Sequence, residues 1–378
     1  MDSTPGRFLI RPGHKLSLVI ITSRNLLRHL LARGLVSSDS VVDGDLVIVD
    51  ATGRNRNFKV IRKHSPSFFV KQVRNWNSQA VAMLQCEAAC YFLARSDPDF
   101  VALAPLIPEL YDFDPDRQTL TTAFISDGED LWEHLRRTGR ISTEIAGELG
   151  RCFGKFHRES ETRLLNSAHS SVFPKQIPWI LSSERRNSHP FKELSPATSQ
   201  LFDHVDESTQ LPVALEELRN QWRVSTLMHG DMRLENCILV QNPDNKPELR
   251  IVDWELADLG DPGWDVGSIL QALLSAHIIS IPPVESKLTL SALLLQPAVT
   301  NLPPTIKSFW ESYERELQSS KNSNPLYRCL SYGAARMIQS AYEYMQFTPS
   351  LSRNALHLVE VSSDIMGNPT AAAELLLG

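Results

Sequence analysis

The chain has 378 residues, of which 42% are hydrophobic and 22% are charged. This composition is typical of a protein that folds around a core, and it excludes the disordered and fibrous classes. At about 150 residues per domain, the length predicts two to three structural units. The net charge of −6 argues against nucleic acid or an anionic membrane surface as the main partner.

The N-terminal region and the cysteines indicate a cellular location. The most apolar N-terminal stretch, residues 16–36, is interrupted by charged residues, which excludes a membrane span there. It also lacks the pattern of a secretory signal, so we expect a cytoplasmic protein with no membrane partner. Cys86 and Cys90 have no nearby Cys or His to complete a metal site, so we expect buried, reduced thiols.

The first predicted elements are a short helix and three strands. Residues 23–34 have the pattern of an amphipathic helix, with Ser23 as N-cap and Gly34 in the left-handed position that ends it. Three β-rich runs separated by turn residues follow, at 46–49, 58–61 and 68–73. We predict that these runs form an antiparallel meander.

A longer helix and two more strands complete the first part of the chain. The helical period over residues 78–95 places apolar side chains on one stripe, and Asp97-Pro98 ends the helix. Two β-like runs flank the turn at residues 112–116, and the second covers residues 118–125. The first 125 residues are therefore expected to form a small sheet that carries one main helix.

The rest of the chain has a predominantly helical pattern. The helical period predicts helices at residues 131–137, 144–158, 306–317, 326–347 and 355–366. Residues 160–208 are rich in Ser, His and Pro, and their composition fits either a substrate-facing insertion or a loop.

Together these elements predict an α+β protein with two lobes. The smaller lobe, residues 41–125, is antiparallel and β-rich, and an extension of residues 1–40 with an amphipathic helix precedes it. The larger lobe, residues 126–378, is α-helical and has an insertion around 160–210.

Polar residues gather around a predicted hairpin. Two β-like runs, 237–240 and 249–252, bracket a turn. Asn236 enters the first strand and Asp253 leaves the second, so we expect both at the same end. Two hard oxygen ligands with few others suit magnesium, which keeps waters and binds substrate phosphates. Asp231, on the loop leading in, would project at the same mouth, where a carboxylate can orient or deprotonate a hydroxyl.

The segment from His229 to Asn236, with Asp253-Trp254-Glu255, resembles the aminoglycoside phosphotransferase and choline kinase-like family. That family carries a His-Gly-Asp-x-x-x-x-Asn loop followed by Asp-x-[Glu/Asp], and both patterns are present here. The resemblance implies a two-lobed protein-kinase-like fold. It also implies that Asp231 is the catalytic base and that Asn236 and Asp253 hold magnesium.

The same resemblance implies further roles. Glu255 would assist as an outer or water-mediated magnesium ligand, and Arg233 stands where protein kinases place a lysine towards the transferred phosphate. Lys71 in a predicted strand and Glu87 in the next helix look like the family's ion pair. The nucleotide-binding residues implied are Lys71, Glu87, Ala123 and Ile125.

Two more segments bear on the expected site. Asp265, in the segment Gly260–Gly267, would hydrogen-bond the catalytic loop in a supporting role. Gly53 is the only glycine between the first two predicted strands, so the phosphate cover is a polar turn instead of a glycine-rich loop. Phosphate binding should then rest on Lys71, Arg233 and magnesium.

The sequence therefore predicts a phosphotransferase that uses magnesium and ATP, or GTP in its place, to phosphorylate an alcohol hydroxyl of a small molecule. One alternative is a kinase that phosphorylates Ser or Thr of a precursor peptide in natural-product (lanthipeptide-like) biosynthesis, with a pathway protein as partner. The other is a nucleotide-binding pseudokinase or scaffold. No nucleic-acid or membrane partner is expected.

Overall fold

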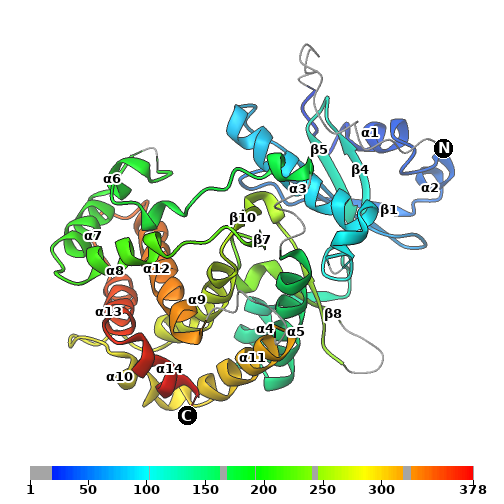
Figure 1. Cartoon of the computed structure of the whole chain (residues 1–378). Coiled ribbons are helices and arrows are strands. Elements are labelled where there is room, and N and C mark those ends of the chain that lie inside the picture. Colours follow the sequence, from blue (N-terminus) through cyan, green and yellow to red (C-terminus); the bar gives the residue numbers. More distant parts are fainter. Residues whose placement is uncertain are drawn as a thin grey trace. The chain divides into compact units, whose positions relative to one another are not determined.

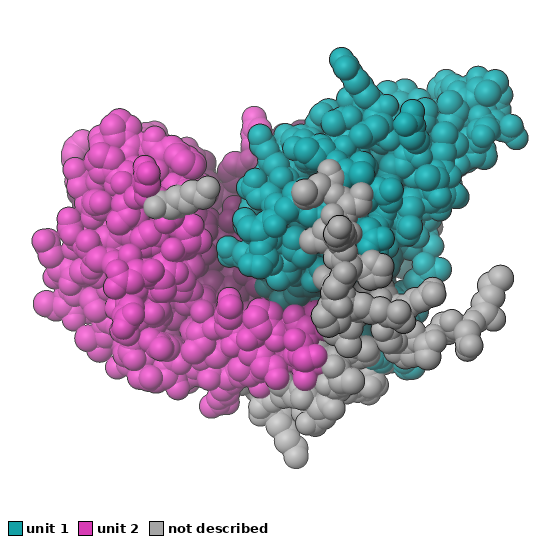
Figure 2. Space-filling view, turned by 90° about the horizontal axis from the view of Figure 1, so that it is seen from above, with its two compact units in different colours: residues 1–129, 238–257 teal, residues 130–237, 258–378 magenta. Residues whose placement is uncertain are grey.

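A computed structural model describes residues 19–101, 103–161, 168–191, 193–240, 246–317 and 325–377. The chain divides into two compact units, which Figure 2 colours separately. The first unit comprises residues 1–129 with 238–257, and the second comprises residues 130–237 with 258–378. None of the described helices is long and apolar enough to span a bilayer.

The first unit is built on a five-stranded antiparallel sheet with the strand order β1-β2-β3-β5-β4 (Figure 1). Its strands are β1 (Leu46–Asp50), β2 (Arg56–Arg62), β3 (Phe68–Gln72), β4 (Leu110–Asp114) and β5 (Thr119–Ala123). Phe58, Val60 and Val70 are buried on these strands and form part of the core. The predicted antiparallel meander is confirmed.

The sheet is accompanied by α1 (Leu26–Ala32), α2 (Ser38–Val42) and α3 (Ser78–Ser96). The predicted cap at Ser23 is wrong, because α1 begins later and Asn25 precedes its first turn. Gly34 has a φ of 70°, as the sequence predicts. Leu26 and Leu30 are fully buried in the same core as the sheet, so this part of the expected extension belongs to the sheet's packing.

Residues 238–257 are grouped with the first unit, which differs from the expected division of the chain. The strands β6 (Gly128–Asp130), β8 (Cys237–Val240) and β9 (Glu248–Ile251) form a three-stranded sheet in the order β6-β8-β9. The turn predicted between the runs at 237–240 and 249–252 includes residues 241–245, which lie outside the described residues. After β9, the chain packs on α3, where the Cys86 thiol donates to the Ala257 carbonyl at 3.0 Å.

The described part of the second unit is mainly helical and includes an antiparallel pair of strands, β7 (Thr226–Met228) and β10 (Asp258–Gly260). Its helices are α4 (Leu131–Thr138), α5 (Thr143–Ser160), α6 (Arg185–Ser188), α7 (Pro196–Asp206), α8 (Leu211–Asn220), α9 (Pro262–Ser280), α10 (Leu290–Leu294), α11 (Leu302–Leu317), α12 (Leu326–Met345), α13 (Arg353–Gly367) and α14 (Pro369–Leu377). The most extensive helix contacts join α5 to α11, α9 to α12 and α12 to α13.

The structure adds helices that the pattern did not predict. Within residues 160–208, whose composition fits an insertion or a loop, α7 buries Leu201 and Phe202, and α8, which follows this region, buries Leu215. The helix α9 is buried on nearly all sides, so its sequence has no polar face and therefore no clear helical period.

Two glycines allow α9 and α12 to lie close together. A Cβ atom added at Gly267 would lie 2.6 Å from the Cys329 carbonyl oxygen and 2.6 Å from the Gly333 backbone nitrogen. At Gly333, an added Cβ would lie 2.7 Å from the Gly267 carbonyl oxygen. Because backbone atoms cannot move aside as side chains do, any larger residue must push the helices apart.

We expect Gly267→Ala to lower the free energy of unfolding by about 1–3 kcal/mol, the usual cost of overpacking a core. Urea unfolding measures this change. Gly53→Ala is the control, because an added Cβ there meets no atom within 4 Å. Equal stability of the two variants would contradict the close contact.

Candidate active site

The first unit holds a buried lysine surrounded by three carboxylates. Lys71 on β3 is 5% exposed, and its Nζ lies 2.8 Å from Glu87 Oε2. The same Nζ lies 2.5 Å from Asp253 Oδ1 and 2.7 Å from Glu255 Oε2. Burial alone would lower the pKa of Lys71, but the carboxylates outweigh it and raise the pKa, so the ammonium stays protonated.

Three elements bring this group together. Lys71 lies in the middle of the sheet, paired with Asn57 on β2 and Leu120 on β5. Glu87 lies within α3. Asp253 follows β9 with a φ of 66°, a left-handed conformation that is uncommon outside glycine and often marks a functional position.

Glu255 also holds the turn between β1 and β2. The Asn55 side-chain amide donates to Glu255 Oε2 at 3.0 Å, and Arg54 Nη1 lies 3.3 Å from Glu255 Oε1. The Arg54 side chain remains 72% exposed. The polar turn predicted around Gly53 therefore brings a guanidinium and an amide to the Lys71 group.

The Lys71 group carries more negative than positive charge. Burial raises the pKa of Glu87 to about 7, although Lys71 opposes this shift; Asp253 and Glu255 add to it. One oxygen from each of the three carboxylates lies within 4.8 Å of the others. Hard oxygen donors gathered in this way are the ligands that a divalent cation such as magnesium prefers.

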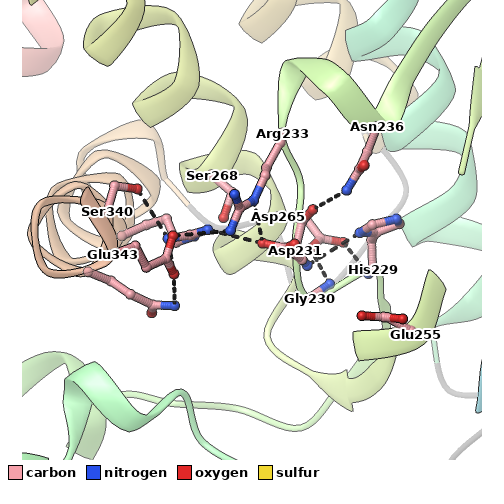
Figure 3. Close-up of polar contacts among 12 residues, drawn as sticks. His229, Gly230, Asp231, Arg233, Asn236, Glu255, Asp265, Ser268, Ser340 and Glu343 are labelled. Atoms are coloured by element: carbon pink, nitrogen blue, oxygen red, sulfur yellow. Dashed lines mark hydrogen bonds and ion pairs between the residues drawn. The ribbon is translucent and has the colours of Figure 1, made fainter. Parts of the chain in front are cut away.

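In the second unit, Asp265 at the start of α9 holds the loop that carries Asp231. Its carboxylate accepts the backbone N–H of His229 at 2.6 Å and that of Gly230 at 2.9 Å (Figure 3). The indole N–H of Trp264 donates to the Gly230 carbonyl at 3.2 Å. These contacts confirm the supporting role expected for Asp265.

The Asp231 side chain is bound by two arginines. Its Oδ1 accepts hydrogen bonds from Arg233 Nε and from Arg336 Nη2, each at 3.0 Å. Burial would raise the pKa of Asp231, but Arg336 and Arg233 outweigh it and lower the pKa to about 2. The carboxylate is therefore ionised at physiological pH, and it is a weak base that is better suited to orient a hydroxyl than to store a proton.

Sequence reasoning missed Arg336 and Glu343, both on α12. Arg336 is 2% exposed, and Glu343 binds Arg233 Nη2 at 3.1 Å and Arg336 Nη1 at 3.2 Å. The sequence feature that could have revealed them is the pair itself: Arg336 and Glu343 are charged residues seven positions apart, on one face of a predicted helix that is otherwise largely apolar. Both residues lie outside the family motifs at 229–236 and 253–255. Arg336 is also 105 residues from Asp231 in the sequence, so spacing alone does not connect them.

The remaining predicted residues lie as follows. Asn236, in the second unit, is 8% exposed, and its side-chain amide donates to the Asp231 carbonyl at 2.9 Å, which leaves its oxygen for a ligand. Ala123 ends β5 and Ile125 follows it, both half-buried. Asn236 and Asp253 belong to different units, so their shared magnesium site stays a prediction.

A cavity of about 460 Å³ lies within the second unit. Its lining includes Arg233, Arg336 and Glu343. The cavity therefore lies next to the two arginines that bind Asp231. Other lining residues, drawn from four different elements, are Trp132, Glu235, Gln271, Ser275 and Asn354.

A profile of the Phosphotransferase enzyme family matches residues 46–284, which is more than half of the chain. The chain therefore belongs to this family.

Several solved kinases have a similar fold. The microcompartment-associated aminopropanol kinase matches with a TM-score of 0.53 at 9% identity, covering 94% of this chain and 98% of that one. Ethanolamine kinase of Plasmodium vivax matches with a TM-score of 0.52 at 12% identity, covering 94% and 93%. An ADP-bound aminoglycoside phosphotransferase matches with a TM-score of 0.52 at 11% identity, covering 91% and 99%. These likenesses confirm the predicted two-lobed kinase-like fold.

One curated relative matches over a short segment. Acyl-CoA dehydrogenase family member 10 of Mus musculus is 50% identical over 42 residues. The match covers 11% of this chain and 4% of the mouse protein, so the chain spans only a small part of that relative.

We expect Asp231→Asn to lower the free energy of unfolding by about 2 kcal/mol at neutral pH, because the pKa of Asp231 lies at about 2, below its usual 3.8. Because the folded-state pKa is depressed, this stabilisation is complete above about pH 5 and is lost as the pH falls through about 2. Urea unfolding of the variant and the wild type, compared at pH 7 and near pH 3, measures it.

Asp203→Asn is the matched control, because Asp203 is a 60% exposed carboxylate paired with Arg186. Its removal should cost little at any pH. A pH-independent difference for Asp231→Asn would contradict the depressed pKa.

Proposed function

We propose that this protein transfers the γ-phosphate of ATP to a hydroxyl group of a small molecule in a magnesium-dependent reaction. The observation that carries the proposal is the ionised Asp231 carboxylate, whose two arginine partners line a cavity in a chain of the phosphotransferase family. A carboxylate in that position can bind and orient an alcohol.

The cavity favours a small acceptor over a peptide. Its volume of about 460 Å³ falls in the range of about 300–1,000 Å³ that is typical of small-molecule sites. Among its charged lining residues, Arg233 and Arg336 balance Glu235 and Glu343. Because these carboxylates do not exceed the cations, the lining does not favour a strongly cationic acceptor.

The Lys71 group is the proposed site for the nucleotide phosphates. Lys71 is held by Glu87, as a phosphate-binding lysine in this fold requires. Arg54, exposed on the turn next to Glu255, can supply positive charge where other kinases use a glycine-rich loop. ADP in the structure of the aminoglycoside phosphotransferase supports a nucleotide site in this fold. Ala123 and Ile125 are proposed to contact the adenine base of the nucleotide.

Asp253 and Glu255 are the residues of the first unit that would hold magnesium, and Asn236 is proposed as a further ligand. The three carboxylates around Lys71 match the hard oxygen donors that this ion requires. When bound, the ion supplies neutralisation of the phosphate charge.

In the proposed reaction, Asp231 orients the acceptor hydroxyl towards the γ-phosphorus. The hydroxyl oxygen forms the new bond to phosphorus, while the bond from phosphorus to the bridging oxygen of ADP breaks. The hydroxyl proton passes to Asp231 and then to solvent. With a pKa of about 2, Asp231 accepts this proton only late, so positioning provides most of its effect.

A screen for phosphate transfer tests this proposal. Purified protein, ATP and magnesium are incubated with neutral, anionic and cationic small alcohols and with Ser- or Thr-containing peptides, and products are identified by a mass gain of one phosphate. We expect transfer to a small alcohol and a loss of about 10²–10⁴-fold in kcat for Asp231→Asn, because the oriented carboxylate is removed. ATP should still raise the melting temperature of that variant.

Other outcomes would favour the alternatives. Transfer to peptides alone would support the peptide kinase. Stabilisation by ATP without transfer to any acceptor would support the pseudokinase.

We expect Arg54→Ala to weaken ATP binding about tenfold while leaving adenosine binding unchanged, because the lost charge would face the phosphates. Calorimetric titration in the presence of magnesium measures both affinities. Arg28→Ala removes an exposed arginine from α1 and is the charge-matched control. Equal ATP affinity of the two variants would remove Arg54 from the phosphate site.

A further inference from the structure

Four charged side chains of the second unit form a closed ring, hereafter the charged ring: Asp231, Arg233, Glu343 and Arg336. Each carboxylate binds both arginines. Asp231 uses a single oxygen for this, Oδ1, at 3.0 Å from each guanidinium. Glu343 uses both of its oxygens, with Oε2 at 3.1 Å from Arg233 and Oε1 at 3.2 Å from Arg336. Figure 3 shows Arg233, Asp231 and Glu343 pointing towards one another.

This geometry distinguishes the two oxygens of Asp231. Both arginine hydrogen bonds end on Oδ1, and none of the described residues donates a hydrogen bond to the second oxygen, Oδ2. The ring thus sets the rotation of the carboxylate and leaves one oxygen for a ligand. An Arg233 contact alone would come from the same loop as Asp231, whereas Arg336 fixes the carboxylate from a separate helix.

The α12 half of the ring is anchored in the fold. Arg336 is 2% exposed and also donates to Ser340 Oγ at 3.1 Å. Gln339 donates to Glu343 Oε1 at 3.1 Å. The ring residues of α12 therefore sit on a buried helix, which positions side chains more precisely than a loop does. This helix lies outside the residues 46–284 that match the family profile.

We infer that Arg336 and Glu343 are positioning residues for phosphate transfer, which hold Asp231 so that Oδ2 meets the acceptor hydroxyl. This inference rests on the proposed function and names residues of the same site that the family motif does not contain. Arg336, Ser340 and Glu343 also line the 460 Å³ cavity, so an acceptor bound there lies against the side chains that orient the carboxylate.

Steady-state kinetics with the acceptor found in the screen, on the full chain, test the inference. Removing one charge of this partly buried ring leaves the others unbalanced and destabilises the protein, so conservative variants are needed. We expect Arg336→Gln to lower kcat about 100-fold, as expected when a reacting group is misplaced, with the KM for ATP unchanged. Arg336→Lys should recover part of this loss, because it restores the charge without the planar fork. Glu343→Gln should lower kcat less than Arg336→Gln does.

The control is Arg328→Lys, at a second buried arginine of α12. Arg328 is 7% exposed and binds Asp261 at 2.5 Å, away from Asp231. Arg328→Lys and Arg336→Lys should both lower the melting temperature, but only the Arg336 variant should lower kcat. A purely structural role predicts that kcat follows stability in both variants.

The outcomes separate the inference from the function on which it rests. If the wild type transfers phosphate and a folded Arg336→Gln variant has the same kcat, the positioning role is overturned and the phosphotransferase function remains supported. A kcat loss in Arg328→Lys as large as that in Arg336→Lys would also overturn it. Absence of transfer by the wild type to every acceptor would overturn the proposed function, and the positioning role with it. A crystal structure of Arg336→Gln should show a rotated Asp231 carboxylate, and an unmoved carboxylate would contradict the inference independently of turnover.

Discussion

The close contact of α9 with α12 at Gly267 and Gly333 determines the geometry on which the second unit's site depends. Asp265 lies two residues before Gly267 on α9 and holds the backbone of the loop that carries Asp231. Arg336 lies three residues after Gly333 on α12 and binds the side chain of Asp231. A change in the spacing of these helices would therefore move the loop and its arginine partner relative to each other, and the hydrogen bonds at 2.6 to 3.0 Å tolerate little displacement.

The charged ring and the Lys71 group differ in how their charges balance. In the second unit, two arginines compensate Asp231 and Glu343, so the charged ring is neutral and Asp231 stays ionised. In the first unit, one ammonium meets three carboxylates, and burial, with Asp253 and Glu255 adding to it, raises the pKa of Glu87. A neutral ring suits Asp231, whose proposed role requires one fixed conformation. An acidic excess suits a group that gains stability when a cation binds.

Much of the site could be predicted from the sequence because its signals are local. The spacing of Asp231 and Asn236 lies within one loop, and the alternation around Lys71 and the period around Glu87 predicted their strand and helix. The structure brings Lys71 and Glu87 to 2.8 Å. Other features escaped prediction because they depend on contacts between distant segments. Leu201 and Phe202 form a helix because other helices cover them, although the composition around them resembles a loop.

The sequence by itself determined the order of the elements, the antiparallel sheet and the identity of the loop and acidic residues that define the family. The elements follow from periodicity and the family residues from the resemblance of two short motifs, and both kinds of signal lie within single segments of the chain. Only the tertiary structure decided that Arg233 pairs with Asp231 and Glu343, that Arg54 reaches Glu255 and that Arg336 completes the charged ring. Electrostatic partners of a buried carboxylate are chosen by distance in space, and helix packing sets that distance across gaps of more than a hundred residues.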